Sequence, residues 1–117
     1  MSGVIPPAVQ DYIDGIGPEH RALFGRLHGL IMRARPDAQV TLSYKMPTYT
    51  AGKRRLYVGA WKHGLSVYGW PQACDNGFTA RHPDFVTSKG TIRLSPRAAS
   101  GITDEELLGL ARAALAP

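Results

Sequence analysis

The chain contains a single cysteine, Cys74, among its 117 residues. One cysteine excludes an intramolecular disulfide and a cysteine-rich zinc site. No apolar run approaches the roughly 20 residues that a membrane-spanning helix needs. The segment from Met1 to Pro7 lacks the charged and then apolar pattern of a signal peptide. We therefore expect a soluble, cytoplasmic protein with no membrane partner.

Signatures of catalysis and cofactor binding are equally scarce. Gly15-Ile16-Gly17 lacks both the further glycine and the preceding strand of a dinucleotide-binding motif. There is no phosphate-binding loop and no Gly-x-Ser-x-Gly elbow. The histidines form no recognised close metal pair; they are His20, His28, His63 and His82. We expect a binding domain without a cofactor rather than an enzyme, and a small enzyme of unknown reaction is the alternative.

Acidic residues are outnumbered by basic ones. The chain has 14 Lys and Arg against 9 Asp and Glu, which gives a net charge of +5 and a pI near 9.7. This balance favours anionic partners such as phosphates, nucleic acids or acidic proteins. It equally suits an ordinary solvated basic surface, because charge alone is weak evidence for a partner.

Apolar periodicity predicts helices at both ends of a single domain, residues 1–117, with residues 1–6 as a flexible arm. One short helix is predicted over Pro7 to Asp14. A second begins at Pro18, carries an apolar stripe at helical spacing, and stops near Arg35 because Pro36 follows. In the last helix, Thr103 is the candidate N-cap and Glu106 completes a capping box.

The central part alternates as strands do. A strand is predicted from Val40 to Met46, with Val40, Leu42, Tyr44 and Met46 pointing to one face. Pro47 is predicted either to end its regular pairing or to place it at an edge of the sheet. Further strands are predicted at Arg55 to Lys62, Leu65 to Trp70 and Thr91 to Leu94, the first two as a hairpin. A short helix before Pro83 is an option. The order predicts an α+β fold, with one antiparallel sheet and the N-terminal and C-terminal helices packed on one face.

Four strings of the sequence resemble the YdhG-like family of bacterial domains of unknown function. They are Arg35-Pro36-Asp37-Ala38, Ser43-Tyr44-Lys45-Met46-Pro47-Thr48-Tyr49, Lys62-His63-Gly64-Leu65-Ser66-Val67-Tyr68 and Lys89-Gly90-Thr91-Ile92-Arg93-Leu94. The resemblance covers roughly Val9 to Leu115. It implies a frataxin-like or related α+β fold and, for one branch of the family, iron delivery.

Iron is therefore an alternative that kinship implies. Hard cations favour clustered carboxylates, and the residues that could serve lie near the first helix: Asp11, Asp14 and Glu19. That set is thin, and basic residues lie close to it in sequence. We expect no cofactor, with an iron-binding chaperone as the alternative function.

The parity of the hairpin strands is the most informative feature. Leu56, Val58 and Ala60 share one face, so Tyr57 and Trp61 share the other. Aromatic side chains beside Lys and Arg could stack on a planar ligand, form a homodimer interface, or make a second core under Pro71 to Ser88. No ribonucleoprotein signature is present, which argues against nucleic acid without settling the matter. The candidate ligand-binding residues are Tyr44, Lys45, Met46, Tyr57, Trp61, His63, Tyr68, Trp70, Lys89 and Arg93.

Overall fold

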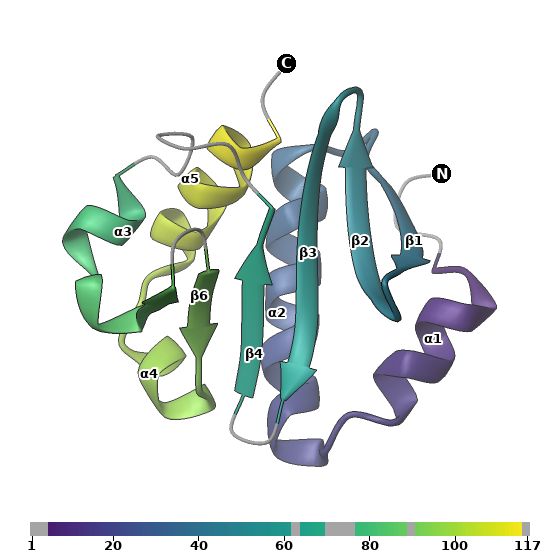
Figure 1. Cartoon of the computed structure of the whole chain (residues 1–117), viewed down its shortest axis with the longest axis horizontal. Helices are drawn as coiled ribbons and strands as arrows, with labels where there is room; N and C mark the ends of the chain where they lie inside the picture. The colour runs from purple at the N-terminus through teal and green to yellow at the C-terminus, as the bar shows by residue number, and fades with distance from the viewer. Residues whose placement is uncertain (1–4, 62–63, 70–76, 89–90, 116–117) are drawn as a thin grey trace.

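The computed structural model describes residues 5–61, 64–69, 77–88 and 91–115. Two helices open the chain, α1 (Pro7–Asp14) and α2 (Pro18–Ala34), and each has a proline in its first turn (Figure 1). Proline suits that place because the first helical N–H groups have no partner within the helix. Both helices agree with the predicted bounds to within one residue.

An antiparallel sheet follows, in the order β1-β2-β3-β4-β6-β5. The α+β fold with one antiparallel sheet is therefore confirmed. Its register pairs Val40 with Tyr49, Tyr49 with Leu56, and Val58 with Val67. The strands are β1 (Gln39–Ser43), β2 (Met46–Ala51), β3 (Arg54–Trp61), β4 (Gly64–Tyr68), β5 (Val86–Ser88) and β6 (Thr91–Leu94).

The predicted strand from Val40 to Met46 is wrong, because the chain reverses inside it. Tyr44 and Lys45 form a two-residue turn in which both have positive φ, 52° and 63°. The turn puts Met46 on the opposite side of the sheet from Val40. Pro47 lies within β2, opposite Leu42, and the pairing of β2 with β3 begins one residue later at Thr48. The missing N–H of Pro47 therefore falls where no bond to β3 is made.

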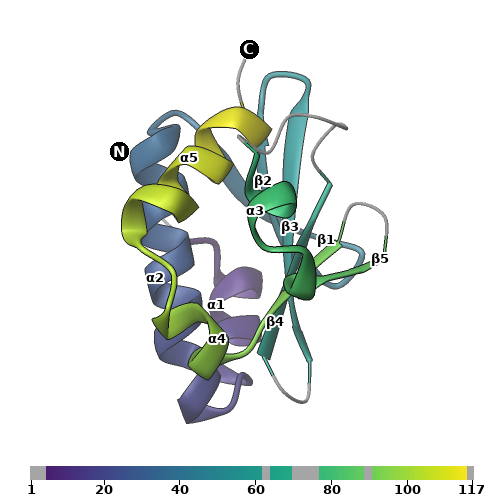
Figure 2. The same ribbon diagram turned by 90° about the vertical axis from the view of Figure 1, so that its left-hand side faces the viewer.

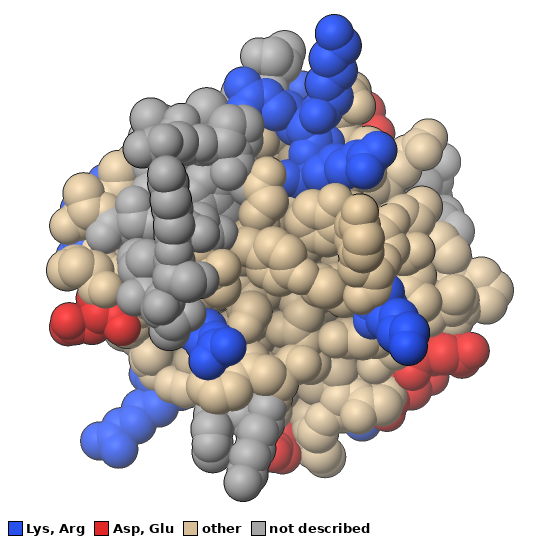
Figure 3. All heavy atoms as spheres, viewed as in Figure 1, with Lys and Arg blue, Asp and Glu red and all other residues tan. Residues whose placement is uncertain are grey.

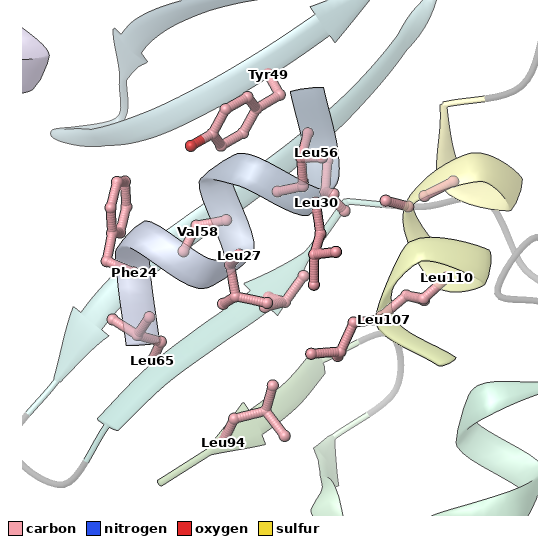
Figure 4. Packing of buried hydrophobic residues seen from close by; sticks show 14 of the residues in the cluster. Phe24, Leu27, Leu30, Tyr49, Leu56, Val58, Leu65, Leu94, Leu107 and Leu110 are labelled. Carbon is pink, nitrogen blue, oxygen red and sulfur yellow. The ribbon is translucent and has the colours of Figure 1, made fainter. Parts of the chain in front are cut away.

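Helices cover one side of the sheet, as Figure 2 shows for α1, α2, α4 (Pro96–Ser100) and α5 (Asp104–Ala114). The apolar stripe of α2 packs against the sheet and against α5, which lies beside it on the same face (Figure 4). Leu56, Val58, Leu65 and Val67 are all buried beneath it. One face of the sheet is thus occupied by the core, and we call the other the outer face.

Two short helices interrupt the second half of the chain, α3 (Phe78–Arg81) between β4 and β5 and α4 between β6 and α5. The predicted helix before Pro83 is confirmed as α3, and the 3-10 turn η1 (Pro83–Phe85) follows it. The helix α4 was not predicted, although Ser95-Pro96 carries its signal. The Ser95 hydroxyl accepts a hydrogen bond from the Ala98 N–H, and proline takes the first helical position.

Candidate functional site

The outer face carries the aromatic residues of the hairpin, as strand parity predicts. Tyr57 of β3 lies directly opposite Tyr68 of β4 in the antiparallel register. The two rings stack, with centroids 5.3 Å apart and planes 14° from parallel. Both side chains are half-buried. The hairpin therefore presents an aromatic pair that the sheet supports from below and that is only partly covered from above.

Tyr44 extends this pair toward the β1 edge of the sheet. Its ring lies 6.0 Å from that of Tyr57, at 55° to it. Tyr44 is 80% exposed, and it stands at the tip of a turn where its own backbone has positive φ. Such a conformation is unfavourable for a bulky residue. We call Tyr44, Tyr57 and Tyr68 the aromatic row.

Two glycines make room for the side chains that lie across the sheet. A Cβ at Gly69 would come within 2.6 Å of Cδ1 of Tyr57, and Gly69 has φ of +106°. A Cβ at Gly59 would lie 3.3 Å from Sδ of Met46. Met46 in turn accepts a hydrogen bond at Sδ from the Tyr68 hydroxyl, at 2.7 Å. The thioether and the glycines thus fix how the aromatic row lies on the sheet.

The Tyr68 hydroxyl is a donor at neutral pH. Partial burial raises the pKa of Tyr68, and the neighbouring Tyr57 raises it further. The phenol therefore keeps its proton and brings no negative charge to the outer face. A ligand that approaches Tyr68 meets an uncharged ring whose hydroxyl donates to the Met46 thioether.

A cation lies on the other side of the row. Cζ of Arg93, on β6, sits 4.6 Å from the ring centroid of Trp61 at the end of β3. The guanidinium is attracted by the electron-rich ring face. Arg93 remains exposed, and Trp61 is half-buried. The planar cation is thus held against the sheet while its N–H edges stay accessible to an anion.

The charge of the outer face has one sign. The sequence from Ala38 to Tyr68 contains no Asp or Glu, and neither does Thr91 to Leu94. Lys45 and Arg55 are exposed and, with Arg93, belong to this face or its rim. In Figure 3 the described part of the face is neutral at its centre, with blue groups around it and red groups only at the periphery. Arg55 was not among the predicted site residues, although it lies two positions before Tyr57 on β3 and so shares the outer face with it.

The predicted site residues fall into two groups. The structure brings together Tyr44, Met46, Tyr57, Trp61, Tyr68 and Arg93, with Lys45 beside them in the turn. His63, Trp70 and Lys89 lie outside the described residues. The described part of the predicted covering segment, residues 77–88, is placed elsewhere: Phe78 is buried in the main core, and His82 bonds α5.

The candidate iron residues are not gathered into a metal site. Asp11 and Asp14 are exposed on α1, and Asp14 accepts a hydrogen bond from the Gln10 amide. Glu19 lies on α2, 3.8 Å from Nε2 of His20. Within the described ranges, no three His, Cys, Asp or Glu side chains are placed to hold a metal ion together. No contact in the described structure therefore favours the iron hypothesis.

A cluster around Glu106 was missed because its members are distant in sequence. Thr103 is the N-cap of α5, as predicted, and its hydroxyl accepts from the Glu106 N–H. The Glu106 carboxylate accepts hydrogen bonds from Nε of Arg81, the last residue of α3, and from Nε2 of His82, which follows it, each at 3.0 Å. It is therefore not bonded to the N-cap N–H as the predicted capping box requires. His82 stacks on Phe85. This cluster fastens α3 to the helix layer.

A hydrogen-bonded pair beneath the sheet, His28 and Tyr49, was also not predicted from the sequence. Nδ1 of His28 lies 2.8 Å from the Tyr49 hydroxyl. Burial lowers the pKa of His28 and raises that of Tyr49, so both are neutral at physiological pH. Nothing in the sequence connects residues on α2 and β2. The pair satisfies two polar groups inside the core, which is a structural role.

None of the helices in the described part of the chain combines the length and apolar character that crossing a bilayer requires. Comparison with family models, with curated proteins and with solved structures found no match to this chain. The resemblance to the YdhG-like family therefore rests on the four sequence strings alone.

Proposed function

We propose that this chain is a non-enzymatic binding domain whose outer face takes a small, planar, negatively charged molecule. One observation carries the proposal. The stacked pair of Tyr57 and Tyr68 stands half-covered between two cationic positions, Lys45 and Arg93, on a face without acidic side chains among its described residues. Flat rings offer a stacking surface, and the cations select for negative charge.

The magnitudes are those of a small-molecule site. Stacking of an aromatic ligand on a tyrosine contributes about 1–3 kcal/mol per ring. An exposed charge pair in water adds about 1 kcal/mol or less. Two or three such contacts correspond to dissociation constants of roughly micromolar to millimolar. Affinity should therefore fall most when the ring of the ligand is removed, and by a smaller factor when its charge is removed.

Nuclear magnetic resonance with a matched set of probes tests this. Adenosine 5′-monophosphate carries both ring and charge, adenosine carries the ring, and ribose 5-phosphate carries the charge. We expect the first to shift the backbone amide signals of β3, β4 and β6. Adenosine should bind up to about five-fold more weakly, because it lacks the charge, and ribose 5-phosphate at least about ten-fold more weakly, because it lacks the ring. Aromatic carboxylates paired with their neutral alcohols extend the set to other planar anions.

Variants locate the site. Tyr57→Leu should weaken binding of the ring-bearing probes, and Arg93→Gln should weaken binding of the charged ones. Arg97→Gln is the matched control, since Arg97 is an equally exposed arginine on α4 in the helix layer. If no planar anion shifts the outer-face amides at millimolar concentration, or if Arg97→Gln weakens binding as much as Arg93→Gln, the proposal is wrong.

A further inference from the structure

The two edges of the sheet differ in how well they are closed. The β5 edge is a three-residue strand, and its pairing with β6 is irregular between Val86 and Ser88. The β1 edge is a regular strand whose sequence, Gln-Val-Thr-Leu-Ser, has neither charge nor proline. Natural sheets usually protect a free edge with a bulge, a charge or a proline. The β1 edge has none of these, so it can pair with another strand.

The register fixes which backbone groups of β1 point outward. In a hairpin with a two-residue turn, Ser43 and Met46 form a hydrogen-bonded pair, and such pairs recur at every second residue. Residues 39, 41 and 43 therefore bond to β2, while the N–H and C=O groups of Val40 and Leu42 point away from it. Within the described ranges, no hydrogen bond to these outward groups is found.

An exposed apolar side chain accompanies this edge. Leu42 has the same parity as the buried Val40, yet it is 40% exposed. With Tyr44, it is one of two large hydrophobic residues that are exposed in the described part of the chain, and both lie at the end of β1. The outward backbone groups of β1 and the exposed apolar side chain of Leu42 therefore lie at the same edge of the sheet.

We propose that β1 pairs with β1 of a second copy of this chain, so that two sheets become one. The strand is complementary to itself in antiparallel register. With Thr41 on the two-fold axis, Val40 lies opposite Leu42 of the second copy. These are the two residues whose backbone N–H and C=O groups point away from β2. Four backbone hydrogen bonds can form, and each exposed Leu42 gains an apolar neighbour.

Charge supports the same register. Asp37 lies two positions before β1 and Lys45 lies in the turn that follows it, so this register brings Asp37 of each copy near the turn of the other copy that holds Lys45. Asp37 is exposed while bound to Arg35 at 3.0 Å, and Lys45 is exposed in the turn. Each end of the paired strands therefore meets a group of opposite sign, twice by symmetry.

The inference is independent of the ligand proposed for the outer face. It extends that face, because the two sheets would share one outer surface and each copy would bring a Tyr44 close to the join. The helix α1, which contacts β1 from the helix side, would face its own copy across the axis. An outer-face dimer would instead cover Tyr57 and Tyr68.

Sedimentation equilibrium of the whole chain from 1 μM to about 1 mM tests the proposal, within the usual range for weak interfaces. We expect a monomer–dimer equilibrium. Leu42→Lys should weaken it at least ten-fold, because it places like charges together at the join. Lys45→Asp should weaken it too, because the introduced carboxylate would lie near the carboxylate of Asp37 in the second copy. Adding Asp37→Lys to Lys45→Asp should restore the dimer.

Unaltered circular dichroism of each variant shows that the monomer is folded. Hydrogen exchange gives the second measurement, since the amides of Val40 and Leu42 should slow with rising concentration while exposed amides elsewhere do not. A chain that stays monomeric at about 1 mM overturns the inference. So does a dimer that survives Leu42→Lys and is lost in Tyr57→Ala, which would place the contact on the outer face.

Discussion

Neighbouring residues of β3 lie on two faces of the sheet that follow different rules. On the helix-covered face, Leu56 and Val58 are almost completely buried, as are Leu65 and Val67 on β4. On the outer face, Tyr57, Trp61 and Tyr68 keep part of their surface exposed, and Tyr44 keeps most of it. The covered face removes its apolar side chains from water, which stabilises the fold. The outer face leaves apolar surface exposed, where a ligand or partner could cover it.

Backbone strain is distributed in the same way. The described non-glycine residues with positive φ are Tyr44 and Lys45, both at the rim of the outer face. The helix-covered side is closed by capped helices and by Arg26, which donates to Asp104 Oδ1 and to the carbonyls of Ala99 and Ile102. The contrast teaches that stability is concentrated on one side of the sheet. The proposed function assigns recognition to residues on the other side.

The sharpest way to break the comparison is to truncate neighbours on opposite faces. Leu56→Ala should cost about 2–5 kcal/mol, because it leaves a cavity beneath α2. Tyr57→Ala should cost about 1–2 kcal/mol, since it loses the stack with Tyr68 and only partial burial. Urea denaturation of both variants measures the difference. Equal losses would show that the outer face is a second core, which contradicts the proposed function.

The strained turn offers the next largest effect, in the opposite direction. Tyr44→Asn with Lys45→Gly supplies the residues that this turn type favours, so it should stabilise the fold by about 1 kcal/mol. Gly52→Ala is the matched control at the β2–β3 turn, where φ is +61° and a Cβ would meet nothing within 4 Å. It should destabilise by about 1 kcal/mol for conformational reasons alone.

Thermal and urea unfolding of the two turn variants would be compared with the parent chain. If the double variant is less stable than the parent, contacts of the Tyr44 ring outweigh the backbone strain. The turn would then belong to the stabilising part of the molecule, and the contrast between the faces would weaken.

Elements whose local signals agree were predictable from sequence. The stripe of α2, its opening Pro18, and the N-cap Thr103 each combine propensity with pattern, and the structure confirms all three. The parity of β3 and β4 was predictable because alternation needs no knowledge of distant residues. That parity, together with hairpin pairing and the turning of the aliphatic residues to the helices, placed Tyr57, Tyr68 and Trp61 on one face.

The rest depends on contacts that local signals do not carry. The turn at Tyr44-Lys45 has no Gly, Asn or Asp, so sequence rules favoured a continuous strand, and Pro47 reinforced the error. Pairing of Val40 with Tyr49, both buried against the helices, overrides that local preference. The partners of Glu106 and of His28 lie more than 20 residues away in the chain, which no periodicity reports.

The N-cap of α5 offers a test of how the helix layer stabilises the covered face of the sheet. Thr103→Ala should cost about 1 kcal/mol, because the Glu106 N–H loses its acceptor. Thr103→Ser keeps the hydroxyl and is the control, with an expected change of a few tenths of a kcal/mol. Chemical denaturation measures both. A loss of equal size in the two variants would mean that the threonine methyl group, rather than the cap, is responsible.

The smallest effect concerns pH and the attachment of α3 to the helix layer. Hydrogen bonds from His82, and then from Arg81, lower the pKa of Glu106 below its ordinary value of 4.5. The carboxylate therefore contributes stability that is present above about pH 4.5 and is lost as the pH falls through the lowered folded-state value. Glu106→Gln should be less stable than the parent near neutral pH, and this gap should narrow on acidification.

Glu105→Gln is the matched control for this last experiment, since it removes the same charge from the neighbouring, exposed position on α5. Urea midpoints measured for the parent and both variants across the acid range would separate the two positions. A gap for Glu106→Gln that stays constant with pH, or one no larger than for Glu105→Gln, would show that the carboxylate does not fasten α3. Attachment of α3 would then rest on the buried ring of Phe78, so that apolar packing alone closes the covered side of the sheet.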